Sequence, residues 1–207
     1  DVASILACGV LTGFGAVVNT ARVRAGSTVA VVGCGGVGIN SIQGAVYANA
    51  SKIIALDLLD DKLALARQFG ATDTVNSSNH DCSEQVIERS GGRGVDYVFV
   101  TVGAKAAIDQ SLGMLAKAGV AVIVGMPESG VMAQYDPGEF AAKGQSLLGS
   151  KMGSGSVQRD IPKLAALYQS GALKLDQMIS GRYALEEINE AIASVKQGEA
   201  LRNVVIF

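Results

Sequence analysis

Residues 29–40 read VAVVGCGGVGIN, an uncharged apolar run that enters a glycine-rich turn. The run predicts a buried strand over Thr28–Gly33, and the small apolar residues after the turn predict a helix over Val37–Ala48. A second apolar run, Lys52–Asp57, predicts the next strand. A strand, a helix and a second strand in this order are typical of a parallel sheet with right-handed crossovers.

Three glycines mark the junction between the first strand and the helix. Gly33, Gly35 and Gly38 form the pattern GxGxxG. In a dinucleotide-binding loop the first glycine permits a tight turn, the second lets a pyrophosphate approach the backbone, and the third lets helix and strand pack closely. The start of the helix adds free N–H groups and the positive end of its dipole. The pattern therefore predicts dinucleotide binding, and a purely structural turn is the alternative.

An acidic residue stands where such a site needs one. Asp57 ends the second strand, 19 residues beyond Gly38. A carboxylate there can accept hydrogen bonds from both ribose hydroxyls of adenosine, and it would repel a 2′-phosphate, which favours NAD over NADP. The alternative is that the acid caps the next helix, but Asp60 is expected to supply that cap.

The alternation of strands and helices continues beyond this unit. The helix after Asp60 is expected to end at Gly70. Further strands are predicted at Asp73–Val75, Val95–Val102, Val120–Gly125 and Ser146–Gly149, with helices at Ser83–Arg89 and Lys105–Leu115. We therefore expect an α/β fold, a Rossmann-type doubly wound parallel sheet.

The pattern changes after Lys151, where a glycine-rich stretch precedes a helical and strand-forming tail. Helices are predicted at Gln158–Gln169 and Leu185–Gln197, followed by a strand within residues 201–207. One apolar stripe on the second helix consists of Leu185, Ile188, Ile192 and Val195. This tail is too small to form a core alone, so we expect it to pack on another part of the protein.

Composition excludes several classes of function. The 207 residues carry a net charge of −2 and no basic run, so no nucleic-acid partner is expected. The three cysteines show no CxxC spacing, which favours reduced thiols and a cytoplasmic location. Residues 2–21 and 28–51 are long and uncharged, but polar residues and glycines interrupt both, so no membrane span is expected. The opening at Asp1 lacks a basic segment, and no signal peptide is expected.

Residues at two later strand ends are further candidates. Gly103 follows the fourth predicted strand, and Val124, Gly125 and Met126 end or follow the fifth. Ligands of open α/β sheets bind at the carboxyl ends of the strands, so these residues are candidates for the nicotinamide end of a cofactor site. Strand-ending turns explain them equally well.

The chain resembles the cofactor-binding portion of the zinc-dependent, medium-chain alcohol dehydrogenase family. The resemblance rests on ordered segments along nearly the whole chain: ACGVLTGFGAV, GSTVAVVGCGGVG, KIIALDLLDDKLALARQFGATDTVN, GGRGVDYVFVTVG and GEALRNVVIF. In that family an alcohol binds zinc and loses its proton, and the alkoxide passes a hydride to NAD. The resemblance thus implies NAD and zinc as cofactors and a small alcohol or aldehyde as substrate.

The resemblance also implies roles for single residues. Cys8 matches the third protein ligand of the catalytic zinc, and Arg202 matches an arginine that reaches the cofactor pyrophosphate. The remaining matches are Thr12 and Val37 beside the nicotinamide, Gly36 in the glycine loop, and Asp57 and Lys62 at the adenosine ribose.

A catalytic zinc needs three protein ligands and one open position, and this chain offers one. His80 is expected to be a solvated loop residue, and Cys82 a thiol at a helix start or in the core. We therefore expect residues 1–20 to be the remnant of a connection to a catalytic domain, residues 21–150 to form the NAD-binding domain, and residues 151–207 to pack on that absent domain. The isolated chain should bind NADH and show no alcohol-dependent turnover.

Three alternatives remain. A zinc-free quinone or enoyl reductase of the same superfamily usually takes NADPH and lacks the cysteine, so Cys8 and Asp57 speak against it. A sugar-alcohol dehydrogenase typically has an acidic residue at the position of Cys8. A stand-alone nucleotide-binding module without catalysis has no use for Cys8 or Thr12. For any of these enzymes the resemblance implies a homo-oligomer joined at the sheet edge, with Ser146–Gly149 as the candidate strand.

Overall fold

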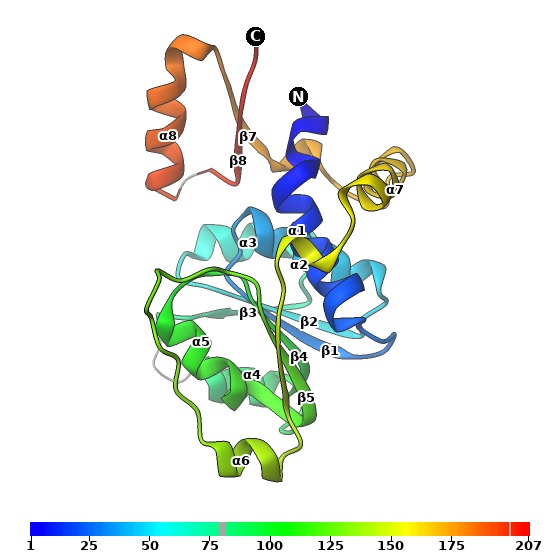
Figure 1. The fold of residues 1–207 in the computed structure, drawn as a ribbon, viewed down its shortest axis with the longest axis vertical. Helices are drawn as coiled ribbons and strands as arrows, with labels where there is room; N and C mark the ends of the chain where they lie inside the picture. The colour runs from blue at the N-terminus through cyan, green and yellow to red at the C-terminus, as the bar shows by residue number, and fades with distance from the viewer. Residues whose placement is uncertain (79–81, 199) are drawn as a thin grey trace.

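The computed structural model describes residues 1–78, 82–198 and 200–207, and a six-stranded parallel sheet forms its centre (Figure 1). Across the sheet the order is β3-β2-β1-β4-β5-β6, and every neighbouring pair is parallel. The strands are β1 Thr28–Val32, β2 Lys52–Asp57, β3 Asp73–Asn76, β4 Val95–Val100, β5 Leu115–Ile123 and β6 Ser146–Gly149. This order is that of a doubly wound nucleotide-binding sheet, which confirms the predicted fold class.

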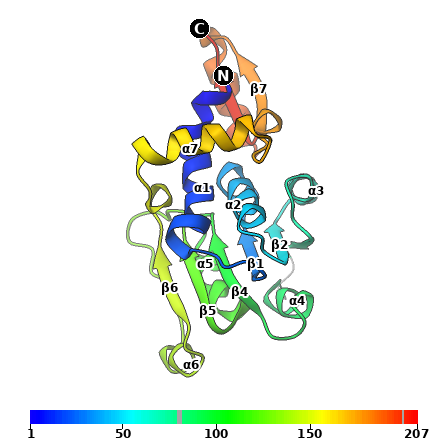
Figure 2. The ribbon, with the colours of Figure 1, turned by 90° about the vertical axis from the view of Figure 1, so that its right-hand side faces the viewer.

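Helices cover both faces of the sheet (Figures 1 and 2). On one face lie α2 (Gly36–Tyr47), α3 (Asp60–Gln68) and the N-terminal helical segment. On the other face lie α4 (Cys82–Arg89) and α5 (Lys105–Ser111), the second of which continues into a 3-10 turn at Leu112–Met114.

The side chains of β1 show why its sequence is apolar throughout. Val29 and Val31 belong to the core cluster that contains Ile39 and Ile42 of α2. Ala30 and Val32 belong to a second cluster with residues of α4 and α5. Successive side chains of a strand point to opposite faces, so a strand covered on both sides must be apolar at every position.

The N-terminal helical segment, residues 2–21, crosses α2 at close range. It runs through a 3-10 turn at Val2–Ile5, π-helical turns at Leu6–Val10 and Ala16–Ala21, and α1 at Leu11–Gly15 between them. A Cβ on Gly13 would lie 2.8 Å from Asn40 Cβ and 2.9 Å from the Ser41 nitrogen, so only glycine permits this approach. The segment is long and apolar enough to cross a membrane by length and composition alone, yet 56% of its most apolar window is buried within the chain.

The last quarter of the chain adds α7 (Val157–Gln169), β7 (Ile179–Tyr183), α8 (Ile188–Lys196) and β8 (Arg202–Val205). Figure 2 shows α7 crossing the N-terminal helical segment, with the two chain ends at the same end of the molecule. β7 and β8 pair in parallel as a separate two-stranded sheet. The apolar stripe of α8 and the turn before it remains exposed, so this chain does not bury it. The packing of residues 151–207 on a further domain stays a prediction.

Several predicted elements differ from the structure. α6 (Pro137–Ala142) and β7 were not predicted. The predicted helix over Lys105–Leu115 is shorter, because β5 begins at Leu115 and passes through Ala118, whose φ is 59°. The Ala118 nitrogen donates to the Lys143 carbonyl at 2.8 Å, which stabilises this irregular position. The first, fourth and fifth strands also end one or two residues earlier than predicted.

Candidate functional site

The glycine loop joins β1 to α2 with open space above it. Gly33 has a φ of 94°, a left-handed conformation that favours glycine. A Cβ on Gly38 would overlap the Gly33 carbonyl oxygen, so helix and loop pack together only with glycine there. By contrast, an ideal Cβ on Gly35 meets no atom within 4 Å. The loop backbone at Gly35 is therefore accessible to a ligand.

A positive charge stands at the beginning of α2. The Arg202 guanidinium lies against Gly36, where an added Cβ would be 2.7 Å from Nη1, and against Gly9, where it would be 2.9 Å from Nε. Arg202 Nη1 donates to its neighbour's carbonyl, Leu201 O, at 3.2 Å, and no ion pair of Arg202 occurs among the described residues. A helix of 12 residues presents free N–H groups and a positive dipole end here. Both features favour an anion at this place.

Asp57 connects the glycine loop to the turn after β2. Its Oδ2 accepts from the Cys34 nitrogen at 2.7 Å, and its Oδ1 accepts from the Leu59 nitrogen at 3.1 Å. Each carboxylate oxygen has two lone pairs, so both can accept a further hydrogen bond. The prediction that Asp60 caps the next helix is wrong: Leu59 is the N-cap of α3, and Asp60 Oδ1 accepts from Asn76 Nδ2 at 2.8 Å.

A cavity of about 510 Å³ opens at the carboxyl ends of β1, β2 and β4. Its polar margin includes Asp57, Lys62 and Gln110, and its lining also contains Ser77 and Cys82. The apolar part of the lining includes Val32, Leu56, Val102, Ala104, Ala107 and Met114. A small-molecule site of this kind is mostly apolar, with a few polar groups that orient the ligand, and its volume lies in the usual range.

Two of these residues, Ser77 and Gln110, were not predicted from the sequence. Ser77 directly follows β3, so the rule that ligands bind at strand ends could have found it. Its Oγ is buried and has no hydrogen-bond partner among the residues that the structure describes. Gln110 Oε1 accepts from the buried Cys82 thiol at 2.9 Å. Cys82 begins α4, as predicted.

The thiol inside the glycine loop is protected. Burial and, to a smaller extent, the nearby Asp57 carboxylate raise the pKa of Cys34 to about 12, while Lys62 acts in the opposite direction. The Cys34 thiol donates to the Leu56 carbonyl at 3.6 Å. Cys34 is therefore a neutral, buried group of the loop rather than a nucleophile.

The two glycines at later strand ends have a packing role. A Cβ on Gly103 would lie 2.9 Å from the Met126 carbonyl carbon, and a Cβ on Gly125 would lie 2.6 Å from the Val102 nitrogen. The backbones after β4 and β5 therefore touch, which supports the structural explanation of these glycines. Val124 is buried and Met126 is exposed. A contact of these residues with a nicotinamide stays a prediction.

Cys8 and Thr12 lie on the N-terminal helical segment. Cys8 is exposed, and the Thr12 hydroxyl lies 3.8 Å from Met152 Sδ. His80 lies outside the described residues. Within the described ranges no three His, Cys, Asp or Glu side chains are grouped to hold a metal ion. These residues alone therefore do not form a zinc site, and the role of Cys8 as a ligand stays a prediction.

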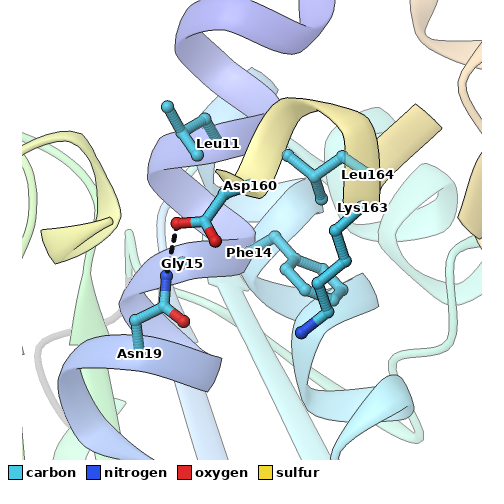
Figure 3. Close-up of a pocket in the computed structure, with 7 residues that line it drawn as sticks. All are labelled: Leu11, Phe14, Gly15, Asn19, Asp160, Lys163 and Leu164. Atoms are coloured by element: carbon cyan, nitrogen blue, oxygen red, sulfur yellow. Dashed lines mark hydrogen bonds between the residues drawn. The ribbon is translucent and has the colours of Figure 1, made fainter. Parts of the chain in front are cut away.

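A second, much smaller hollow lies where α7 meets the N-terminal helical segment (Figure 3). Its volume is about 10 Å³, which is room for one water molecule and not for a cofactor. Asp160 projects into this contact and accepts from Asn19 Nδ2 at 3.3 Å and from the Ser156 nitrogen at 2.9 Å. The polar contact joins two helices that are far apart in the sequence.

Residues 36–170 match the sequence model of the zinc-binding dehydrogenases. The chain belongs to this family. It is 38% identical to the S-(hydroxymethyl)glutathione dehydrogenase of Saccharomyces cerevisiae, across 99% of this chain and 54% of the yeast protein. Its fold matches benzyl alcohol dehydrogenase from Acinetobacter calcoaceticus with a TM-score of 0.93 and 34% identity, over 97% of this chain and 55% of that one. A zinc-binding dehydrogenase from Sinorhizobium meliloti 1021, solved with NADP bound, matches with a TM-score of 0.86 and 28% identity, over 98% and 58% of the two chains.

This member of the zinc-binding dehydrogenases spans about half the length of the curated relatives it matches. The range that the family model matches, residues 36–170, includes the glycine loop from Gly36 onward, most of the residues that line the cavity beside Asp57, and all of α7. That range ends before β7 and β8, so Arg202 lies outside the residues that the family model matches.

Proposed function

We propose that this chain is the NAD-binding part of a larger zinc-type alcohol dehydrogenase. The observation that carries the proposal is the Arg202 guanidinium at the beginning of α2, which forms no ion pair with the described residues, beside a glycine loop with free space above Gly35. A phosphate-bearing ligand satisfies both groups at once. The adjoining cavity next to Asp57 has room for the adenosine of the same ligand.

Each part of the cofactor has residues to hold it. The adenine fits the apolar cavity, the adenosine ribose fits Asp57 and Lys62, and the pyrophosphate fits Gly35, Gly36 and Arg202. The nicotinamide would lie toward Thr12, Val37, Gly103 and residues 124–126. When bound, NAD supplies the hydride acceptor, and this chain's residues orient it and exclude water from it.

Asp57 favours NAD over NADP. Its carboxylate is held in place by the Cys34 and Leu59 nitrogens, so it cannot turn away from a 2′-phosphate without losing both bonds. The structural relative from Sinorhizobium meliloti was solved with NADP, so the choice between the two cofactors is the point to test.

The test is to titrate the 207-residue chain with NADH and NADPH and to follow cofactor fluorescence. The wild type should bind NADH at least tenfold more tightly than NADPH. Asp57→Asn should lower NADH affinity roughly 10- to 100-fold, because a hydrogen bond to a charged group contributes about 1.5–3 kcal/mol. NADPH affinity should not fall.

Asp61→Asn is the matched control, because Asp61 is an exposed acid in the first turn of α3 and does not line the large cavity. It changes the net charge equally and should leave both affinities unchanged. Equal binding of NADH and NADPH by the wild type would refute the choice of NAD.

In the whole protein we propose hydride transfer between a small alcohol or aldehyde and NAD, with Cys8 as one zinc ligand. Support comes from the family of the chain and from the exposure of the Cys8 thiol. The described residues of the chain do not complete a metal site, so it should bind NADH and show no alcohol-dependent turnover by itself. Turnover by the isolated chain would contradict this division of labour. A cytoplasmic location and a homo-oligomer belong to the same proposal.

A further inference from the structure

Two amide side chains of α2 are buried where apolar residues would be expected. Asn40 and Gln43 are 0% and 4% exposed, on the face of α2 that packs toward the N-terminal helical segment and the segment after α7. Buried amides are stable only when hydrogen-bonded, and such networks specify one arrangement of the elements they join. These two side chains take no part in the cofactor contacts described above.

Their hydrogen bonds connect Gly36, in the first turn of α2, with Lys174, in the segment that follows α7. Asn40 Nδ2 donates to the Gly36 carbonyl at 2.7 Å, and Gln43 Nε2 donates to Asn40 Oδ1 at 3.2 Å. The Lys174 nitrogen donates to Gln43 Oε1 at 2.7 Å, and Gln43 Nε2 lies 3.4 Å from the Lys174 carbonyl. Gly36, at one end of this network, is the residue against which Arg202 lies.

The other end of the network leads to Arg202 by a second route. After Lys174 the chain passes through the turn Asp176–Met178, whose buried Met178 sulfur lies 3.4 Å from Asn40 Nδ2. The next residue, Ile179, begins β7 and pairs directly with Arg202 of β8. One buried network therefore holds both the turn of α2 under the guanidinium and the strand pair that carries it.

We infer that Asn40 and Gln43 are positioning residues for Arg202. They fix the β7–β8 pair on α2, so that the guanidinium already lies at the beginning of the helix before a ligand arrives. An arginine held in place loses less conformational freedom when it binds an anion than a free one does. The inference rests on the proposed cofactor function and names residues that support its pyrophosphate contact.

The test uses ADP-ribose, which carries a pyrophosphate, and adenosine, which does not. Gln43→Met keeps the length of the side chain and removes its hydrogen bonds. It should raise the Kd for ADP-ribose about tenfold and leave the Kd for adenosine unchanged. Gln158→Met, the same change at an exposed position of α7, is the matched control and should change neither Kd.

A double-variant cycle separates positioning from general loosening. Arg202→Ala should also raise the Kd for ADP-ribose. The double variant Gln43→Met, Arg202→Ala should have the same Kd for ADP-ribose as Arg202→Ala alone. Three outcomes would each overturn the inference. These are additive losses of ADP-ribose affinity in the double variant, an equal loss of adenosine affinity in Gln43→Met, or an unchanged Kd of Gln43→Met for ADP-ribose.

If Gln43→Met does not fold, Gln43→Asn keeps the amide but shortens it and should show the same selective loss. If that variant also fails to fold, the pair serves stability alone and the inference is overturned. If the wild type binds neither ligand, the proposed function fails. If the wild type binds both and the variants bind equally well, only the positioning role fails.

Discussion

The three cysteines of this chain differ because of their surroundings. Cys8 is exposed on the N-terminal helical segment, whereas Cys34 and Cys82 are buried. Burial raises the pKa of Cys34 from 9.0 to about 12, so its thiol stays protonated throughout the neutral range. The neutral form stabilises the folded chain below the unfolded pKa, and this contribution is lost as the pH rises from about 9 toward 12.

Thiol titration checks this difference. At pH 8 a disulfide reagent should modify one thiol of the folded chain rapidly and all three after unfolding. Cys8→Ser should abolish the rapid phase and leave two thiols that react only in denaturant. Rapid modification of Cys34 in the folded chain would contradict its burial and its raised pKa.

At the scale of elements, the contact between α7 and the N-terminal helical segment depends on close packing and one buried acid. Gly153, in the 3-10 turn Met152–Ser154 that precedes α7, approaches Gly15 so closely that a Cβ on Gly15 would lie 2.8 Å from Gly153 Cα. Beside them Asp160 is only 7% exposed. The Arg159 guanidinium, the Ser156 nitrogen and Lys163 together hold the pKa of Asp160 below its usual range, against the effect of burial.

Asp160→Asn should lower the free energy of unfolding by about 1–2 kcal/mol at pH 7, since it weakens hydrogen bonds to a charged group. A lowered folded-state pKa stabilises the chain above the unfolded value of about 3.9, and this stabilisation is lost as the pH falls through the folded value. The difference in the free energy of unfolding between wild type and Asp160→Asn should therefore become smaller below about pH 4. Urea unfolding from pH 7 to pH 3 measures it, with Asp61→Asn as an exposed control. A difference in the free energy of unfolding that stays constant with pH would exclude the charge of the Asp160 carboxylate as its cause.

At the scale of the whole molecule, β6 is an edge strand that pairs with β5 and with no further strand of the described residues. β6 is exposed along its length, with Leu147 and Leu148 among its side chains. The Ser150 nitrogen donates to the Ile123 carbonyl of β5, so by alternation the Leu147 N–H faces away from the sheet. An exposed apolar edge strand is a template for pairing with a second copy.

If the proposed homo-oligomer pairs through β6, the wild type should sediment as a dimer and Leu147→Pro as a monomer, because proline removes an outward N–H without breaking the ladder to β5. NADH affinity should stay unchanged, since β6 does not line the large cavity. Leu147→Ile keeps a strand-forming apolar side chain and should remain dimeric. A Leu147→Pro chain that still sediments as a dimer would place the contact elsewhere.

Local patterns accounted for the central sheet and for part of the candidate site. Neighbours a few residues away determine the strand before Gly33, the helix after it and the position of Asp57 at the end of β2. The spacing of apolar residues along the chain therefore predicts all three. β7 was missed because its residues, ISGRY, lack a continuous apolar run, and it is a strand only through its pairing with β8. The sequence predicted Asp60 as the N-cap of α3, whereas the N-cap is Leu59. The Asp60 side chain instead accepts a hydrogen bond from Asn76 of β3, and the sequence near Asp60 does not show this contact.

By itself the sequence determined the doubly wound fold, the glycine loop and the acid at the strand end, because each depends on spacing along the chain. Only the tertiary structure decided what surrounds them. It brought Arg202 to the beginning of α2, formed the cavity beside Asp57, and joined Gln43 to Lys174. The Arg202 and Gln43 contacts join residues more than 100 positions apart, and the cavity is formed by several strand ends together. A local sequence pattern does not show which distant residues come into contact.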